Sequence, residues 1–249
     1  MNQIQIIKYP DTIKPFAVIY KPAGLASAPL SKDDNDNALC QAIKLIPELE
    51  QVKGRKEIEH GLIHRLDTAT SGLMIIARTQ ECYDELIQLQ QENKITKSYY
   101  AWCNVLTENE RAAQGFPEQS FDLSKKSFEI TSYFRAYGPG RKEVRPVLQS
   151  SGMAALKKLE KPVLYTTKIN IQEIDYEKKL AKVLCKITNG YRHQVRCHLA
   201  WCGLPVMYDK TYNPVNEKSA EAMRFCACNI EFEYPRGDLN SYDRKDTWT

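Results

Sequence analysis

The chain contains short apolar stretches with two different periodicities, one typical of strands and the other typical of helices. Alternating or unbroken apolar runs predict strands over residues 3–9, 16–20, 73–77, 97–105, 163–174, 179–188 and 224–234. Apolar residues spaced three and four apart predict helices over residues 38–46, 80–93 and 191–202. The run at 73–77 is apolar at every position, which indicates a strand that is buried on both faces.

The order of these elements favours one class of fold. The predicted strands come in adjacent runs rather than in strict alternation with helices, which favours an α+β fold with a largely antiparallel sheet. Residues 107–160 show the weakest pattern, and we interpret them as a loop or a small insertion. No internal repeat is visible, so we expect a single domain over residues 1–249.

Composition and charge narrow the class of protein. The chain of 249 residues is 43% hydrophobic and 27% charged, which is typical of a globular protein. No apolar run approaches the about 18 residues of a membrane span, and residues 1–8 lack the apolar core of a signal peptide. We therefore expect a cytoplasmic protein without a membrane partner. The net charge of +4 is too small to indicate a nucleic-acid partner, but it permits one if the basic residues gather on one face.

The eight cysteines raise the question of disulfides or zinc. Without a secretion signal, a disulfide framework is not expected. His193, Cys197, His198 and Cys202 lie close enough in sequence to suggest zinc, but the chain has no C-x-x-C pair and the spacing matches no zinc finger. His198 and Cys202 also lie four apart on one predicted helix, so core packing explains them. We expect no metal site.

One group of chemically reactive side chains lies directly before the apolar run at 73–77. His64, Arg65 and Asp67 occupy this position, where polar groups at the mouth of a buried strand can face a cleft. The alternative is a surface pair of Arg65 and Asp67, which would contribute little stability. The pattern alone leaves both readings open.

Two further groups have similar alternatives. Arg192, His193 and Arg196 lie at the start of a predicted helix, where they form either an anion site or a solvated basic face. Tyr99 lies in the strand at 97–105, where it stacks on a base or packs as a core aromatic. The chain has no phosphate-binding P-loop, no dinucleotide fingerprint and no nucleophile-elbow motif.

The segment His64-Arg65-Leu66-Asp67-x-x-Thr70-Ser71-Gly72-Leu73 resembles the signature of RluA-type RNA pseudouridine synthases. Four further segments resemble motifs of that family and occur in the family's order: Lys21-Pro22-Ala23-Gly24-Leu25, Lys97-x-Tyr99-x-Ala101, His193-Gln194-Val195-Arg196-x-His198-Leu199 with Gly203-x-Pro205, and Phe225-Cys226-Ala227 with Phe232 and Pro235. The resemblance covers residues 16–105 and 163–235, a matched core of 16–235 that contains the possible insertion at 107–160. Five ordered motifs make it highly specific.

The resemblance implies a fold and a function. The fold would be the α+β catalytic fold of pseudouridine synthases, with a mixed, mostly antiparallel sheet, flanking helices and a central active-site cleft. The function would be isomerisation of specific uridines to pseudouridine in structured ribosomal or transfer RNA, by base flipping and without a cofactor. We expect a monomer that lacks the S4 RNA-binding domain of many relatives. RNA would then dock on catalytic-domain surfaces, including residues 107–160.

The resemblance also implies roles for individual residues. Asp67 would be the catalytic aspartate, Tyr99 would stack against the flipped base, and Arg196 would pair with Asp67 and keep it ionised. Arg65 would help to extrude the target uridine and replace it. Substrate contacts are also implied for His64, Arg192, His193 and Gln194. Neither the residues nor the resemblance decides whether the aspartate attacks the base or the sugar.

Two departures from the family pattern affect these expectations. The first arginine of the basic-helix motif is shifted by one place to Arg192, which makes Arg196 the better candidate. Tyr208-Asp209 replaces the familiar Gly-Asp, which is expected to reshape a local turn.

Two rival functions stay open from the sequence. The first is a catalytically inactive RNA-binding protein on the same fold. The second is a glycoside hydrolase that uses Asp67 with a second carboxylate, Glu143 or Asp209, at the separation of about 5–10 Å that such enzymes need. The many arginines near these residues suit RNA better than a neutral sugar.

Overall fold

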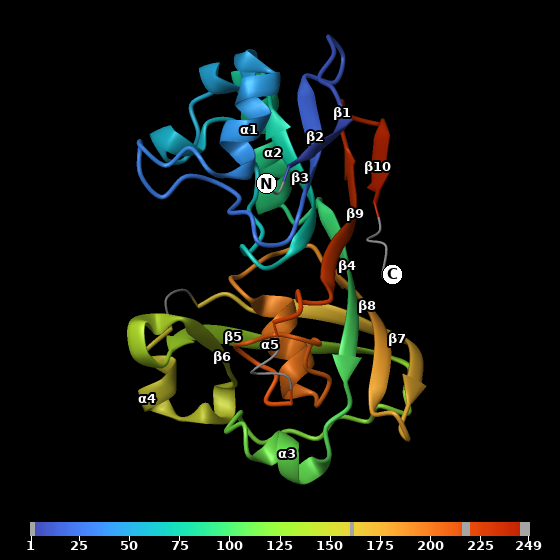
Figure 1. Ribbon diagram of the computed structural model, residues 1–249. Coiled ribbons are helices and arrows are strands. Elements are labelled where there is room, and N and C mark those ends of the chain that lie inside the picture. The colour runs from blue at the N-terminus through green and yellow to red at the C-terminus, as the bar shows by residue number, and fades with distance from the viewer. Residues whose placement is uncertain (1–2, 160–161, 216–219, 245–249) are drawn as a thin grey trace. The chain divides into compact units, whose positions relative to one another are not determined.

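The computed structural model describes residues 3–159, 162–215 and 220–244, which divide into two compact units (Figure 1). Unit 1 consists of Met1–Ser98 and Cys226–Thr249, and unit 2 consists of Tyr99–Phe225. Residues 1–2 at the start of the sequence and residues 245–249 at its end lie outside the described residues. No helix in the described part of the chain combines the length and the apolar character that crossing a membrane requires.

Unit 1 is built on a sheet in which the strand order is β1-β2-β3-β9-β10. The strands are β1 (Gln5–Lys8), β2 (Phe16–Lys21), β3 (Ser71–Ala77), β9 (Phe225–Glu233) and β10 (Leu239–Asp243). Their pairs are antiparallel except that of β3 with β9, which is parallel. Every residue of β3 is buried, as its unbroken apolar run predicts.

The helices of unit 1 begin where the sequence supplies capping side chains. Asn37 accepts a hydrogen bond from the backbone N–H of Cys40 at the start of α1 (Ala38–Leu45). Thr79 caps α2 (Gln80–Gln91) in the same way. Tyr83 and Leu86 of α2 pack into the main core of the unit. Two 3₁₀ turns, η1 (Pro47–Gln51) and η2 (Glu57–Glu59), complete the unit.

Unit 2 contains a second set of strands in the order β4-β8-β7-β5-β6. Its elements are β4 (Thr96–Asn104), α3 (Glu108–Ala112), β5 (Ser127–Tyr137), η3 (Pro139–Arg141), β6 (Glu143–Val147), η4 (Gln149–Ser151), α4 (Met153–Leu156), β7 (Tyr165–Asp175), β8 (Leu180–Ile187) and α5 (Gln194–Trp201). All eight residues of α5 are buried, and the helix lies across one face of the sheet (Figure 1). Phe134, Val144 and Cys197 form part of the core between them.

The predicted fold class is confirmed, because the sheet pairs are mostly antiparallel and few helices flank them. The interpretation of residues 107–160 as a loop was wrong, since β5 and β6 lie in that segment and belong to the sheet, and the alternative of a small insertion stays a prediction. The inward positions of β5 include Ser132, which bonds the buried ring of His198. A polar inward residue hid the alternation that marks a half-buried strand.

Gly72 allows the close approach of β3 and β9. Its φ of +132° lies in a region that L side chains rarely adopt, and a Cβ built there would lie 2.4 Å from the carbonyl oxygen of Ala227. Ala227 is also the register partner of Gly72 in the parallel pair. The only parallel pairing in the described sheet of unit 1 therefore depends on the absence of a side chain at this position.

We expect Gly72→Ala to lower the free energy of unfolding by about 3 kcal/mol or more, because it adds a steric clash to backbone strain. Gly237→Ala is the matched control, since Gly237 also has a positive φ, +87°, but no atom within 4 Å of its Cβ position. The control should cost about 1 kcal/mol. Urea unfolding of the two variants measures both values, and equal losses would contradict the clash.

Candidate active site

Asp67 lies in a closed loop that leads into β3. Before the loop, the carbonyl oxygen of Gly61 accepts a hydrogen bond from Ala77 N–H at 2.8 Å, and Ile63 N–H donates to Ile75 at 3.1 Å. Within the loop, the Asp67 carbonyl accepts a hydrogen bond from Thr70 N–H at 2.9 Å. The loop is therefore fastened to β3 at its start and closed by a turn at Asp67.

Two side chains anchor this loop, one from the last residue of β2 and one from the segment that follows it. Ser27 Oγ donates to the Leu66 carbonyl at 2.7 Å and accepts from Leu66 N–H at 3.0 Å. Lys21 Nζ donates to the carbonyl of Thr68 at 3.3 Å and to that of Leu25 at 2.7 Å. Lys21 and Ser27 thus hold the backbone on both sides of Asp67. The sequence pattern gave no sign that these two side chains lie near Asp67.

Lys21 is also an electrostatic neighbour of Asp67. Its side chain is fully buried, and burial lowers the pKa of Lys21 to about 8, while the negative charge of Asp67 acts in the opposite direction. The resemblance included Lys21 only as part of an early turn, and the spacing of 46 positions between the two residues gave no signal of their contact.

Half-buried His64 and buried Lys97 form a second polar group in unit 1. Burial lowers the pKa of Lys97 to about 8. Burial, and secondarily the positive charge of Lys97, lowers the pKa of His64 to about 3, so His64 is neutral at pH 7. Its Nε2 atom is buried and has no hydrogen-bond partner among the described residues. A neutral His64 can accept or donate a hydrogen bond, but it adds no charge for phosphate binding.

Arg65 differs from its neighbours because its side chain is 57% exposed. It pairs with Glu59 at 3.1 Å, and not with Asp67 as the surface-pair alternative suggested. Exposed pairs of this kind contribute at most about 1 kcal/mol. Arg65 can therefore leave Glu59 at small cost and reach a ligand outside the protein.

Tyr99 and Arg196 lie in unit 2. One face of the Tyr99 ring is stacked on Phe225, with centroids 5.2 Å apart and an angle of 12° between the rings. Arg196 forms a buried bidentate pair with Asp209, through Nε to Oδ2 at 2.8 Å and Nη2 to Oδ1 at 2.7 Å. Nη2 also donates to Thr211 at 3.2 Å. The fold therefore fixes the guanidinium of Arg196 in one orientation.

The turn before Asp209 shows how the chain accommodates a residue that departs from the family pattern. Tyr208 takes a left-handed backbone conformation with φ of +63°, which is uncommon for a bulky residue. Arg224 lies over its ring at 5.8 Å. Tyr208, which stands where the resemblance implies a glycine, thus adopts a backbone conformation that glycine adopts freely.

The start of α5 differs from the sequence prediction. The helix begins at Gln194 rather than at 191, and His193 before it is left-handed with φ of +57°. The spacing of four between Arg192 and Arg196 would place them on one face of a helix that began at 191. Because Arg192 lies before the helix, the two residues do not share a helix face. Arg192 is exposed and donates to the backbone carbonyls of Arg141 and Glu143, at 2.6 and 3.1 Å.

His193 and Gln194 bond to other parts of unit 2. His193 Nδ1 lies 3.1 Å from the Tyr212 hydroxyl. The Gln194 amide accepts from Tyr191 N–H at 2.9 Å and donates to the Thr166 carbonyl at 3.0 Å. Both side chains hold the turn that leads into α5.

The four residues whose spacing suggested a zinc site, His193, Cys197, His198 and Cys202, make hydrogen bonds within the protein. His198 lies between Ser132 and Thr167, 2.9 Å from each hydroxyl, and burial lowers the pKa of His198 to about 3. All eight cysteines are free thiols. Among the residues the structure describes, no group of three or more His, Cys, Asp and Glu side chains is arranged to hold a metal.

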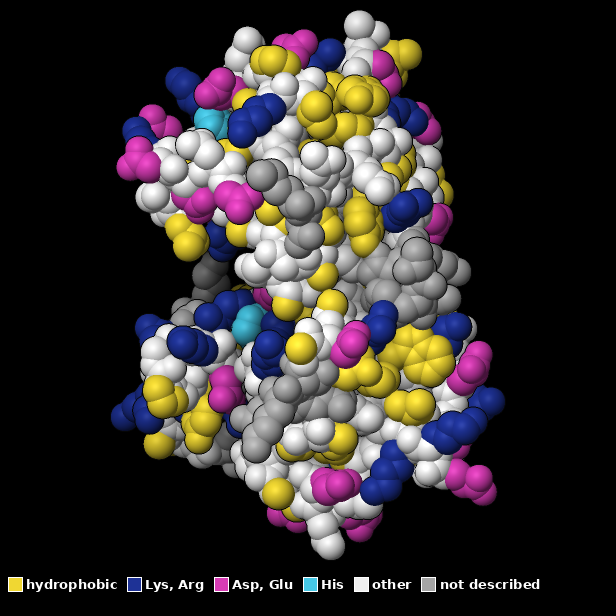
Figure 2. All heavy atoms as spheres, viewed as in Figure 1, with side chains coloured by type: hydrophobic (Ala, Val, Ile, Leu, Met, Phe, Trp, Pro, Cys, Tyr) yellow, Lys and Arg dark blue, Asp and Glu magenta, His cyan; other side chains and the backbone are white. Residues whose placement is uncertain are grey.

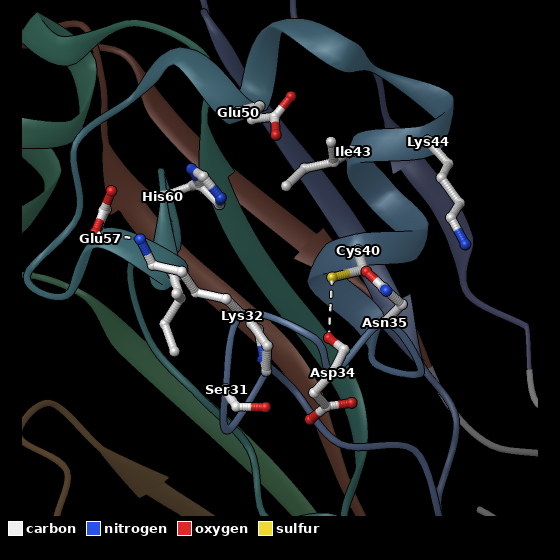
Figure 3. A pocket seen from close by; sticks show the side chains of 12 residues that line it. Ser31, Lys32, Asp34, Asn35, Cys40, Ile43, Lys44, Glu50, Glu57 and His60 are labelled. Carbon is white, nitrogen blue, oxygen red and sulfur yellow. Dashed lines mark hydrogen bonds and ion pairs between the residues drawn. The ribbon is translucent and has the colours of Figure 1, made fainter.

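Unit 1 also contains an open pocket of about 320 Å³ near α1 (Figure 3). Its lining includes Cys40 and His60, and Lys32 pairs with Glu57 at its edge at 3.1 Å. None of the site residues expected from the sequence lines this pocket. It is therefore separate from the Asp67 loop.

The predicted site residues fall into two groups. Unit 1 brings Asp67 together with Lys21 and places His64 next to Lys97. Unit 2 places Tyr99, Arg192, His193, Gln194 and Arg196, of which Arg196 is bound to Asp209. The meeting of Asp67 with Tyr99 and Arg196 stays a prediction.

The fold is that of the pseudouridine synthases. The human protein RNA Pseudouridylate Synthase Domain Containing 1 superposes with a TM-score of 0.67 at 19% identity, covering 100% of this chain and 85% of its own. RNA Pseudouridylate Synthase Domain Containing 4, also human, gives a TM-score of 0.59 at 17% identity, with coverage of 92% and 85%. At this identity the likeness establishes the architecture alone.

The family follows from the sequence match. The model of the RNA pseudouridylate synthase family matches residues 15–201, and the chain belongs to this family. An uncharacterized RNA pseudouridine synthase of Aquifex aeolicus is 30% identical over 196 residues, covering 79% of this chain and 52% of that protein. The resemblance stated from the motifs is therefore confirmed.

Two relatives with more specific names are more distant. Ribosomal large subunit pseudouridine synthase D of Neisseria meningitidis serogroup B is 25% identical, covering 89% of this chain and 50% of that protein. The tRNA pseudouridine(31) synthase of Saccharomyces cerevisiae is 27% identical, with coverage of 84% and 46%. The matches thus span about half the length of these curated relatives.

The buried neutral His198 predicts a pH dependence of stability. Its pKa is about 3 in the folded protein and 6.5 as the ordinary value, so only the unfolded state binds this proton between these limits. Stability should therefore fall as the pH falls from about 6.5 towards 3, by about 1.4 kcal/mol per pH unit from this group. We expect His198→Gln to show a flatter pH profile of unfolding free energy, and parallel profiles would contradict this.

The buried pair of Arg196 and Asp209 predicts a large loss on removing the carboxylate. Asp209→Ala leaves the Arg196 side chain, 6% exposed, without that partner, and we expect a loss of about 3–5 kcal/mol. Asp175→Ala is the control, because Asp175 pairs with Lys178 at 44% exposure, and it should cost less than about 1 kcal/mol. Thermal and urea unfolding measure both. A small loss for Asp209→Ala would show that the pair does not stabilise the unit.

Proposed function

We propose that the protein is an isomerase that converts specific uridines of structured ribosomal or transfer RNA to pseudouridine. The observation that carries the proposal is the Asp67 loop. The family's signature places an aspartate at this position, and Lys21 and Ser27 fix the backbone on both sides of it. Relatives named for ribosomal and for transfer RNA support both substrate classes.

The chemistry fits the groups that the chain supplies. The bond between N1 of uracil and C1′ of ribose breaks, a bond between C5 and C1′ forms, C5 loses a proton and N1 gains one. Atoms and electrons balance without an oxidant or a reductant. The step needs a carboxylate that acts as a nucleophile or a base, and we assign this role to Asp67.

Arg196 and Tyr99 are the partners that we propose for Asp67 and for the flipped base. A guanidinium favours the charged form of a nearby carboxylate, and the pair with Asp209 presets the orientation of Arg196. Tyr99 already rests on Phe225, which fixes the plane of its ring. A flipped base that stacks on this ring would regain about 1–3 kcal/mol of the cost of leaving the RNA helix.

The other predicted contacts divide into two kinds. Arg65 and Arg192 are exposed, and we assign them to RNA contact. The amide of Gln194 is buried and bonded within unit 2, which supports a positioning role more than direct contact. We propose the same positioning role for His193, through Tyr212.

The rival functions have less support. Both oxygens of Asp209 accept hydrogen bonds from Arg196, and Glu143 pairs with Arg145 at 3.1 Å, so neither carboxylate is placed as the second acid of a glycoside hydrolase. No observation favours an inactive RNA-binding protein. A cytoplasmic monomer with one catalytic domain and a central cleft stays a prediction.

We expect Asp67→Asn to abolish pseudouridine formation while leaving RNA binding and folding intact, because it removes the charge but keeps the size of the side chain. The assay follows tritium release from C5-labelled uridine in unmodified ribosomal and transfer RNA transcripts. Asp33→Asn is the control, since Asp33 is an exposed aspartate of the same unit. Turnover by Asp67→Asn at the wild-type rate would overturn the assignment.

A further inference from the structure

The hairpin of β5 and β6 has two faces of opposite character. Phe134, Val144 and Pro146 are buried, and the first two pack with residues of α5 in one core cluster. The other face carries two register pairs, Arg135 opposite Arg145 and Tyr137 opposite Glu143. The apolar face therefore fixes the position of the polar face relative to α5.

Arg135 and Arg145 lie directly opposite each other on this polar face. Two like charges in such a cross-strand pair destabilise a sheet unless other groups compensate them. Arg145 is offset by Glu143 at 3.1 Å and donates to the Gln114 carbonyl at 2.8 Å. Arg135 has no ion pair with any described residue. The polar face thus holds one positive charge that no anion among the described residues balances.

The guanidinium groups of Arg135 and Arg145 also lie close to aromatic rings. Arg135 and Arg145 both lie near the ring of Tyr137, at 4.9 and 5.1 Å, and Arg145 lies 4.3 Å from the ring of Phe116. Tyr137 is 42% exposed. The result is a partly exposed aromatic ring with two guanidinium groups close to it. Proteins that bind single-stranded nucleic acids combine such rings, which stack on bases, with cations that contact phosphates.

The tip of the hairpin adds further charges in a fixed place. Arg141 and Lys142 are exposed, and the carbonyls of Arg141 and Glu143 accept hydrogen bonds from Arg192. These contacts tie the tip to the turn before α5. Figure 2 shows Lys and Arg side chains gathered over this part of unit 2, around a histidine.

We propose that this surface, the hairpin face made by Arg135, Tyr137, Lys142, Arg145 and Arg192, binds the substrate RNA. Its cations contact backbone phosphates, and Tyr137 stacks an unpaired base. RNA fits better than an acidic protein because the exposed ring offers a stacking surface that a carboxylate-rich partner would leave unused. The inference rests on the proposed function, since it names where that RNA docks.

The test compares two double variants of unit 2 that remove the same charge. Arg135→Gln with Lys142→Gln alters the hairpin face, and Lys168→Gln with Lys186→Gln alters an exposed cross-strand pair elsewhere in the sheet. Binding of unmodified transfer RNA and large-subunit ribosomal RNA transcripts is measured over a salt series. For the first variant we expect affinity for at least one transcript to fall about tenfold, and the salt slope to fall by roughly 0.7 per lost phosphate contact.

A second pair of variants separates stacking from charge. Tyr137→Ser should weaken binding about fivefold without changing the salt slope, and Tyr137→Phe should bind as the wild type does. Charge-conserving Arg135→Lys with Lys142→Arg should keep most of the affinity, and it serves as the folded reference. Loss of binding in this last variant would assign the effect to structure and overturn the proposal.

The outcomes also separate this inference from the proposed function. Equal losses in the two charge-removing variants, or no loss in either, would overturn the hairpin face even if the wild type makes pseudouridine. A selective loss in the hairpin variant supports it even if no transcript is modified, because binding is measured in the Asp67→Asn background. Selective loss of binding to a polyglutamate peptide, with RNA binding unchanged, would assign the face to an acidic protein and overturn the proposal.

Discussion

The buried ammonium group of Lys21 is the interaction on which the arrangement of unit 1 depends. A buried charge is costly unless hydrogen bonds replace those that it makes with water. The ammonium of Lys21 donates such bonds to the carbonyls of Pro22 and Leu25, which follow β2, and to the carbonyl of Thr68 in the Asp67 loop. The need to satisfy one ammonium therefore brings together two segments that are far apart in sequence. The negative charge of Asp67 further favours the charged form of Lys21. The loop is therefore held by polar contacts as well as by the buried side chain of Leu66.

In unit 2, a buried charge is compensated by an ion pair. Arg196 and Asp209 are both buried, and their bidentate contact fixes the plane of the guanidinium. Removal of either partner would leave the other charge buried without its counterion, which is strongly destabilising. In both units, then, the groups assigned to chemistry are oriented by buried charges rather than by flexible surface contacts. Such preorganisation is what a site needs when it must bind a flipped nucleoside.

The sequence pattern predicted the elements whose signal is local. β3 followed from its apolar run and α2 from its helical period. The family signature indicated Asp67, whose catalytic role stays a prediction. β10 escaped prediction because its residues are mostly polar. The start of α5 was placed too early because His193 takes a left-handed conformation, which periodicity does not reveal. The partners Lys21 and Asp209 depend on contacts between distant segments, and such contacts exist only in the folded chain.

The path of the chain through the two units has a consequence for biosynthesis. Unit 2 is one continuous segment, whereas unit 1 needs β9, whose partner β3 is made more than a hundred residues earlier. During synthesis from the N-terminus, the start of β3 at Ser71 and Gly72 stays without its parallel neighbour until β9 has left the ribosome, whereas β2 and residues 61–63 can already pair with the rest of β3. An unpaired strand edge of this kind invites aggregation. Nascent chains of this protein therefore expose the edge of β3 at Ser71 and Gly72 for most of translation, and a chaperone that covers strand edges would be of most use in that interval.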